Sequence, residues 1–219
     1  MYGTIVDWES GIVTALQPTF AAHGKTFDAP RVLEAFAEAE AALEARPYLR
    51  YRHILARVLD ELGARFGFAP SDAERTGFGA SVAAWPLFAD SAEALAALKK
   101  RYKLGILTNC DTDLAGESVA KTGVDFDWLI TAQQAGSYKP SENNFQFMLE
   151  RTGLPRERVL HVAQSLFHDH VPAKALGFTT VWVNRRAGKS GSGATPPADA
   201  KPDYEVPDLK SLVKLTSSR

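Results

Sequence analysis

The chain has 219 residues, of which 45% are hydrophobic and 23% charged, and its formal net charge is -1. These values are ordinary for a water-soluble globular chain that builds one good core and a smaller second unit. The near-zero charge, with basic residues scattered among acidic ones, excludes the electrostatic footprint of a nucleic-acid-binding protein. We therefore expect a small-molecule ligand.

Targeting and redox signals are weak throughout the chain. No apolar run approaches the roughly 18 residues that a membrane-spanning helix needs, and no charged start followed by an apolar stretch marks a signal peptide. The single cysteine, Cys110, excludes an intramolecular disulfide and a multi-cysteine metal site. We expect a cytoplasmic protein without a membrane partner, in which Cys110 packs as a small apolar residue rather than serving as a nucleophile. The sequence leaves the oligomeric state open, and a homodimer is one of the options.

The first third of the chain has a helical pattern. Residues 11–78 are rich in Ala, Leu and Glu, and their apolar residues recur at helical spacing. These positions are Val32, Phe36, Leu43, Ile54, Leu55, Val58, Leu59 and Leu62. We predict that residues 12–85 form a helical domain, inserted into a second domain made of residues 1–11 and 86–219.

From Pro86 onward, helical and strand patterns alternate. Predicted helices cover residues 91–101, 114–121, 143–151 and 171–176, and predicted strands cover residues 104–107, 128–130, 159–162 and 179–183. This alternation predicts a doubly wound α/β domain with a parallel sheet and right-handed crossovers. Residues 189–202, rich in Gly, Ser, Pro and Ala, predict a surface loop before a short strand and helix near residues 204–213.

Three predicted strands end in polar residues, at the sheet edge where such folds bind ligands. Thr108 and Asn109 follow the first strand and can hold carboxylate or phosphate oxygens, although they are also common in turns and helix caps. Lys139 follows the second, either as an ammonium group beside a carboxylate or as a solvated loop residue. Asp169 follows the third and suits both a catalytic role and a helix N-cap. We expect no metal site from the flanking His168 and His170.

Together with Tyr2-Gly3-Thr4, these segments resemble the four ordered motifs of the haloacid dehalogenase superfamily. The first motif reads Asp-x-[Asp/Tyr]-Gly-[Thr/Val] in that family, and its leading Asp, the covalent nucleophile, would stand directly before Met1. Thr108-Asn109 match the second motif, Lys139-Pro140 the third, and Ala163-Gln164-Ser165 with Asp169 the fourth. The resemblance implies a Rossmann-like core with an inserted helical cap domain.

Two departures from the family pattern distinguish between the phosphatases and the dehalogenases of the superfamily. Its phosphatases hold Mg²⁺ with acidic residues of the first and fourth motifs and use a second Asp as general acid. Here Tyr2 and Gln164 stand at two of those acidic positions, so we expect poor metal binding, no cofactor and no proton donor for an alcohol. A halide leaving group needs no proton, and the chain is similar to the type II 2-haloacid dehalogenases. The alternatives are a Mg²⁺-dependent small-molecule phosphatase and a non-catalytic binding or structural homologue.

The resemblance also implies roles for single residues. Lys139 would keep the nucleophile ionised and help to bind a small haloacid, and Asp169 would orient Lys139 or water. The expected substrate-binding residues are Thr4, Tyr2, Thr108, Asn109, Ser165 and Phe145, with Arg46 or Arg50 of the cap receiving the halide. Phe145 and Leu166 stand where family members often carry Tyr and Asn, which argues against strict 2-haloacid specificity.

The start of the chain suggests an internal methionine chosen as start codon, since Met1 occupies the x of Asp-x-Tyr-Gly-Thr. In the family, the strand before this point lies in the middle of the sheet. Its removal would leave two neighbouring strands with unpaired edges and an open core, which disfavours a stable fold. We therefore expect the printed chain not to dehalogenate.

Overall fold

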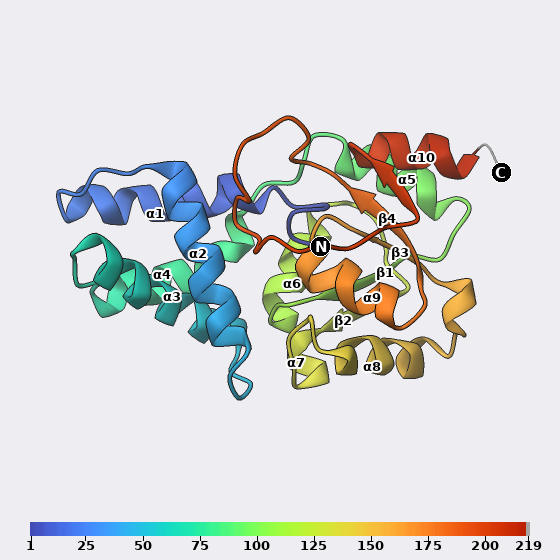
Figure 1. Cartoon of the computed structure of the whole chain (residues 1–219), viewed down its shortest axis with the longest axis horizontal. Coiled ribbons are helices and arrows are strands. Elements are labelled where there is room, and N and C mark those ends of the chain that lie inside the picture. The colour runs from blue at the N-terminus through green and yellow to red at the C-terminus, as the bar shows by residue number, and fades with distance from the viewer. Residues whose placement is uncertain (218–219) are drawn as a thin grey trace.

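The computed structural model describes residues 1–217, which form a helical part and an α/β part lying side by side (Figure 1). The helical part, called the cap below, contains α1 (Trp8–Ala22), α2 (Ala29–Glu44), α3 (Tyr51–Phe66), α4 (Asp72–Ala80) and the 3-10 turn η1 (Ser81–Ala84). The helical cap expected from the sequence is confirmed. Its predicted bounds, residues 12–85, stay a prediction; the first cap helix, α1, begins before residue 12. Within residues 1–217, no helix has the length and apolar character needed to cross a membrane.

The cap helices follow from their apolar stripes and end signals. In α3 the predicted residues Ile54, Leu55, Val58 and Leu59 are fully buried, as helical spacing requires for one packed face. Ser71 and Glu74 form a capping box at the start of α4. The N-cap residue of α3, Arg50, makes no side-chain capping bond, so the free amides of that helix start need another acceptor.

Within residues 1–217, the α/β part, which we call the core, has five parallel-paired strands. They are β1 (Gly105–Thr108), β2 (Trp128–Thr131), β3 (Leu160–Ala163), β4 (Thr179–Val183) and β5 (Tyr204–Val206). The intervening elements are α5 (Ser91–Lys99), α6 (Thr112–Ala120), α7 (Ala132–Ala135), α8 (Glu142–Thr152), η2 (Arg156–Arg158), η3 (Leu166–His170), α9 (Val171–Ala175) and α10 (Leu209–Ser217). The predicted α/β class is confirmed.

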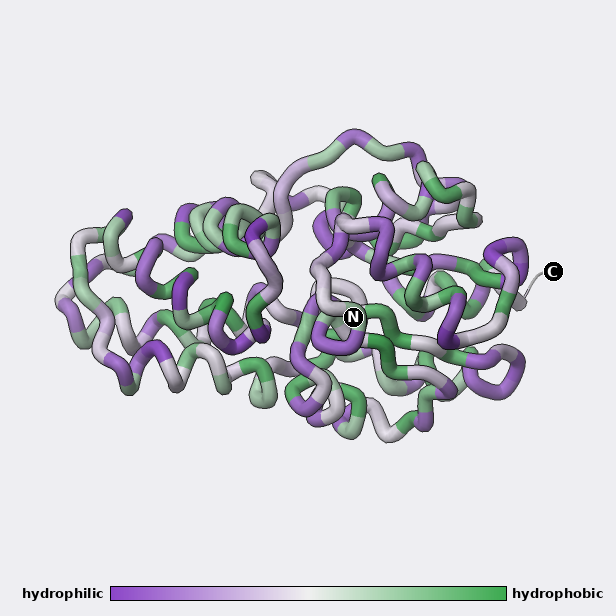
Figure 2. Tube along the Cα trace, turned by 90° about the horizontal axis from the view of Figure 1, so that it is seen from below, coloured by the Kyte–Doolittle hydropathy of each residue, from purple (hydrophilic) through white to green (hydrophobic). Residues whose placement is uncertain are grey.

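Helices cover both faces of the strands. Neighbouring residues of one strand point to opposite faces, so Ile106 packs with α5 and α10 while Leu107 packs with α8 and α9. Hydrophobic segments accordingly lie inside the core, with hydrophilic loops at its margin (Figure 2). The carboxyl ends of β1 and β3 point toward the cap, which makes this edge the natural place for a binding site.

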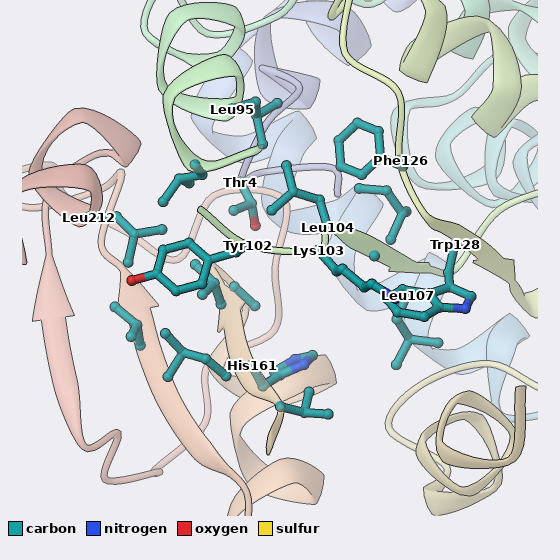
Figure 3. A pocket seen from close by; sticks show the side chains of 18 of the residues that line it. Thr4, Leu95, Tyr102, Lys103, Leu104, Leu107, Phe126, Trp128, His161 and Leu212 are labelled. Atoms are coloured by element: carbon teal, nitrogen blue, oxygen red, sulfur yellow. The ribbon is translucent and has the colours of Figure 1, made fainter. Parts of the chain in front are cut away.

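The strands form two sheets rather than one. One sheet contains β1 and β2, the other contains β3, β4 and β5, and no described strand pairs with the remaining edge of β1 or of β3. Between the sheets lies a cavity of about 470 Å³ with a largely apolar lining that includes Leu95, Leu107, Val162 and Leu212 (Figure 3). We call it the inter-sheet groove.

Candidate active site

Residues from the four predicted segments meet where β1 and β3 end, under the cap. They line a cavity of about 40 Å³, which we call the central cavity and which has room for about one water molecule. Its lining includes the predicted residues Tyr2, Thr108, Asn109, Lys139, Ser165 and Asp169. Side chains more than 160 positions apart in the sequence therefore share one site.

A buried ion pair lies at the centre of this site. The Lys139 ammonium group donates to Asp169 Oδ1 at 2.7 Å and to the Leu107 carbonyl at 3.2 Å. His161 Nε2 lies 3.0 Å from the same Asp169 oxygen. Burial alone would raise the pKa of Asp169, but Lys139 and His161 outweigh it and hold that pKa well below its usual value. Asp169 is therefore an ionised carboxylate that holds the Lys139 ammonium group in place.

The structure separates the alternatives that the sequence left open for these two residues. Lys139 is only 4% exposed, so it is not a solvated loop residue. The N-cap position of α9 is His170, which makes no side-chain capping bond, and the Asp169 carboxylate turns toward Lys139 instead. Asp169 therefore does not cap α9, and its catalytic role stays a prediction.

Asn109 fixes the loop that carries Lys139. Its Oδ1 accepts from the Lys139 backbone N–H at 2.8 Å, and its Nδ2 donates to the Lys139 carbonyl at 2.9 Å. The same Nδ2 donates to Glu44 Oε2 of the cap at 2.9 Å. Asn109 thus connects the end of β1, the lysine loop and α2.

The opening segment folds into a tight turn beside the fourth motif. Gly3 has φ +77°, a left-handed conformation that other residues rarely adopt, so the turn favours glycine. The Thr4 hydroxyl accepts from the Gln164 N–H at 3.0 Å, and Thr4 lines the inter-sheet groove instead of the central cavity. The Tyr2 hydroxyl lies 3.3 Å from Cys110 Sγ. Burial raises the pKa of Cys110 to about 12, which keeps it a neutral thiol.

Besides Thr4, three predicted substrate contacts do not reach the central cavity. Arg46 lies beyond the end of α2, after its C-cap residue Ala45, and lines a separate hollow between α2 and α3. Arg50 pairs with Asp113 at 3.3 Å. Phe145 is fully buried against the rings of His161 and Phe178, because its face of α8 packs on the sheet. Neither proposed halide-binding arginine stands on the cavity wall.

The cap contributes residues that sequence reasoning missed. Glu40, Glu44 and Tyr51 line the central cavity, and the Tyr51 hydroxyl donates to Glu40 Oε1 at 2.6 Å. A signal was available, since both glutamates continue the apolar stripe of α2 at helical spacing after Leu33 and Ala37. Carboxyl groups on an apolar stripe are rare unless they serve a site.

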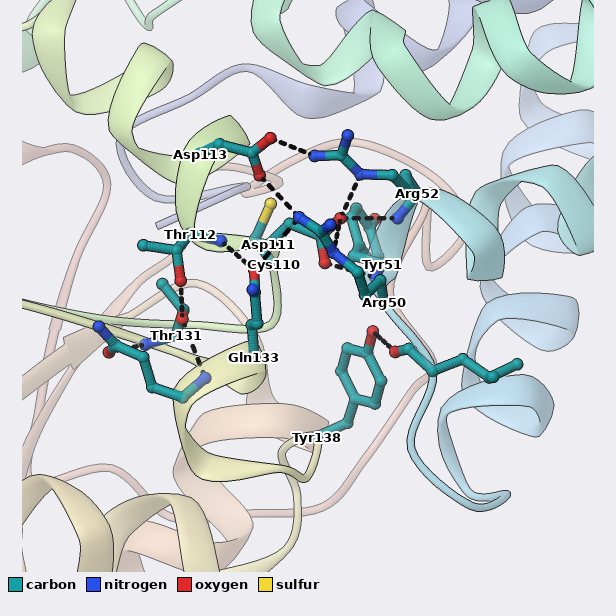
Figure 4. A network of polar contacts seen from close by, with 12 residues as sticks. Arg50, Tyr51, Arg52, Cys110, Asp111, Thr112, Asp113, Thr131, Gln133 and Tyr138 are labelled. Atoms are coloured by element: carbon teal, nitrogen blue, oxygen red, sulfur yellow. Dashed lines mark hydrogen bonds and ion pairs between the residues drawn. The ribbon is translucent and has the colours of Figure 1, made fainter.

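A further missed residue, Asp111, connects the cap to the core (Figure 4). Its carboxylate accepts from the Tyr51 N–H at 2.8 Å and from the Arg52 N–H at 3.3 Å, the first two amides of α3. The Arg52 side chain adds a hydrogen bond from Nε at 2.8 Å. A core residue thus supplies the helix cap that Arg50 does not.

The residues at the fourth motif do not suit Mg²⁺, the metal that the phosphatases of the resembled superfamily use. Gln164 offers a neutral amide oxygen, which already accepts from the Thr195 hydroxyl at 3.3 Å. Asp169 Oδ1 is occupied by Lys139 and His161. Among residues 1–217, no group of three or more His, Cys, Asp or Glu side chains is arranged to hold a metal ion. No step below passes through a metal.

Comparisons with known proteins agree on one family. A family model described as a haloacid dehalogenase-like hydrolase matches residues 1–176. Haloacetate dehalogenase H-2 of Moraxella sp. (strain B) is 33% identical over 125 residues, which are 56% of this chain and 53% of that protein. Pyrimidine 5'-nucleotidase YjjG of Escherichia coli (strain K12) is 30% identical over 118 residues, covering 52% of each chain. The chain thus spans about half the length of the curated relatives it matches.

The fold has close counterparts among solved structures. L-2-haloacid dehalogenase from Xanthobacter autotrophicus superposes with a TM-score of 0.81 over 99% of this chain and 95% of that one, at 22% sequence identity. At this identity the likeness supports the architecture of core and cap and no more.

Proposed function

The chain belongs to the haloacid dehalogenase-like hydrolases, and we propose that its site is built to hydrolyse small 2-haloalkanoic acids to 2-hydroxy acids. The observation that carries the proposal is the buried Lys139–Asp169 pair beside Asn109. Lysine has three N–H donors, and two are used by Asp169 and Leu107, so one remains for a ligand or a nucleophile. The dehalogenase relative supports the same reading.

The attacking carboxylate would be carried by a strand that precedes Met1 and fills the inter-sheet groove. The Met1 amino group is buried, and burial together with the charge of Lys139 lowers its pKa to about 5. A residue joined to this nitrogen would stand close to Lys139 and Asp169. Asp7 cannot replace it, because its carboxylate caps α1 by accepting from the Ser10 N–H and hydroxyl.

The proposed chemistry has two balanced steps. A carboxylate oxygen of the added Asp attacks the α-carbon, forms a C–O ester bond and expels the halide with the electron pair of the C–X bond. Water then adds to the ester carbonyl, and the acyl C–O bond breaks. One water proton goes to the alkoxide to give the 2-hydroxy acid, and the other is released to solvent as the carboxyl group ionises to the free carboxylate. Lys139 would keep the nucleophile ionised and attract the substrate anion, and Thr108 would bind a carboxylate oxygen. Asn109, expected from the sequence to bind the substrate as well, would instead hold the lysine loop, because both N–H groups of its amide already contact Glu44 and Lys139.

The test compares the printed chain with one extended at Met1 by about six apolar residues ending in Asp. We expect halide release from 2-chloropropionate by the extended chain, and none by the printed chain or by an extended chain ending in Asn. Turnover by the printed chain would mean that the nucleophile lies elsewhere. A well-folded extended chain inactive on all haloacids would refute the proposal.

A small-molecule phosphatase is the second candidate, favoured by the nucleotidase relative at 30% identity. Measuring phosphate and halide release side by side, with and without Mg²⁺, separates the two functions. Phosphate release without halide release would favour this second candidate.

A further inference from the structure

The loop that carries Lys139 contacts the cap through the side chain just before the lysine. The Tyr138 hydroxyl donates to the Leu49 carbonyl, in the connection between α2 and α3, at 2.7 Å (Figure 4). The Tyr138 ring stacks on that of Tyr48 in the same connection, with ring centroids 5.4 Å apart. Tyr138 is buried, which strengthens its hydrogen bond. The lysine loop, residues 137–140, is therefore held by the cap as well as by the core.

A second contact between the cap and the lysine loop runs through Asn109. Glu44 Oε2 of α2 accepts from Asn109 Nδ2 at 2.9 Å, and the same amide holds the Lys139 N–H at 2.8 Å and the Lys139 carbonyl at 2.9 Å. Glu44 and Lys139 are 8% and 4% exposed, so this chain of hydrogen bonds lies away from solvent. All three bonds restrict one amide group, so the place of Asn109 depends on the cap as well as on the lysine loop.

The position of the lysine charge depends on how this loop is held. Lys139 Nζ reaches two acceptors of the core, Asp169 Oδ1 at 2.7 Å and the Leu107 carbonyl at 3.2 Å. When the cap separates from the core, these acceptors stay in place, whereas the lysine loop loses both of its cap contacts. A loop with fewer fixed hydrogen bonds opens more often, and a misplacement of about 1 Å is enough to weaken catalysis.

We propose that Glu44 is a positioning residue: through Asn109, it couples closure of the cap to the placement of the Lys139 ammonium group. The inference rests on the proposed function for the role of Lys139, and on the contacts of Asn109 for the coupling. Its consequence is an order of events. The positive charge of the site is held in place only after the cap has closed over the substrate, so the attack begins in a closed site.

Hydrogen exchange of the Lys139 N–H in the printed chain, resolved by NMR, tests the coupling. Glu44→Met fills the same space but offers no acceptor, so we expect this N–H to exchange about tenfold faster or more than in wild type. Glu44→Gln keeps a carbonyl acceptor and should stay within about threefold of wild type. Glutamine suits the position because burial and the neighbouring Glu40 raise the pKa of Glu44 well above its usual value, although Asn109 and Lys139 act in the opposite direction.

Tyr51→Phe is the matched control. It also removes one buried hydrogen bond of the cap, from the Tyr51 hydroxyl to Glu40 Oε1 at 2.6 Å, but it leaves Asn109 untouched. Its Lys139 N–H should exchange within about threefold of wild type. Tyr138→Phe breaks the other cap contact of the lysine loop and should speed the same N–H about fivefold or more, so the coupling is still tested if Glu44→Met does not fold.

The outcomes separate this inference from the proposed function. Equal acceleration in Glu44→Met and Tyr51→Phe would mean that any loosening of the cap frees the lysine loop, and it would overturn the role of Glu44. An unchanged Lys139 N–H in Glu44→Met or in Tyr138→Phe, or a fast one in Glu44→Gln, would overturn it too. Exchange is measured without turnover, so the inference stands or falls independently of halide release by the extended chain, which decides the proposed function.

Discussion

Replacing Lys139 by Met should destabilise the fold strongly, because it leaves the Asp169 carboxylate buried beside His161 alone. Methionine keeps an apolar stem of similar length, so the change removes mainly the charge and two hydrogen bonds. Breaking a buried pair by removing one partner costs about 3–5 kcal/mol. Lys174→Met is the control: Lys174 pairs with Asp203 at the same 2.7 Å, but the side chains are 33% and 37% exposed, so we expect a loss of about 0–1 kcal/mol.

The effect should depend on pH in a defined direction. The folded-state pKa of Asp169 lies below its unfolded value, so its ionisation stabilises the fold above about pH 4 and that stabilisation is lost as the pH falls. Without Lys139 the folded pKa rises, so the difference from wild type should be large at pH 7 and smaller toward pH 4. Adding Asp169→Asn to Lys139→Met should recover part of the stability.

Urea unfolding, followed through the four tryptophans, measures these differences. A loss in Lys139→Met no greater than in Lys174→Met would refute the electrostatic account of the site. A loss that is the same at pH 4 and pH 7 would equally contradict it, since it would point to lost packing instead of an uncompensated charge.

Further predictions concern metal, catalysis and the cap. Halide release by the extended chain should persist in EDTA, because Gln164 and Asp169, which already pairs with Lys139, are poor Mg²⁺ ligands. If EDTA abolished activity and Mg²⁺ restored it, the result would favour the phosphatase. In that chain Lys139→Ala should lower kcat about 10²-fold or more and His168→Ala much less, and equal losses would contradict the assigned roles. Asp111→Ala should lower the free energy of unfolding by about 2–4 kcal/mol through lost capping and Arg52 bonds. Asp113→Ala, with a 60% exposed side chain, should lower it by about 1 kcal/mol or less in the same urea assay, and matching losses would argue against the cap role.

The sequence predicts the core part of the site well. Lys139 and Asp169 each follow a buried strand, and parallel strands bring their carboxyl ends to one edge, so chain order alone predicts that they lie close together. These features depend on local patterns and on a small set of allowed connections.

The contacts between the cap and the core could not be predicted in the same way. The apolar stripe of α2 indicates that Glu44 is buried, but it does not indicate that this face meets the core, which depends on how the cap docks. Arg46 lies beyond the end of the helix, so no helical pattern sets its direction. Asp111 capping α3 joins residues 60 positions apart in the chain, and its own position before α6 suggests an ordinary local N-cap instead. Contacts between two domains are settled by packing, so they become visible only in three dimensions.

The capping of α3 by Asp111 makes two backbone amides into reporters of domain closure. The N–H groups of Tyr51 and Arg52 are protected only while the cap rests on the core, since their acceptor belongs to the other domain. When the domains separate, these amides lose their acceptor and exchange their hydrogens with solvent, whereas amides in the middle of α3 keep their own helical bonds. The ratio of the two exchange rates therefore measures how often the site opens, without any ligand or label.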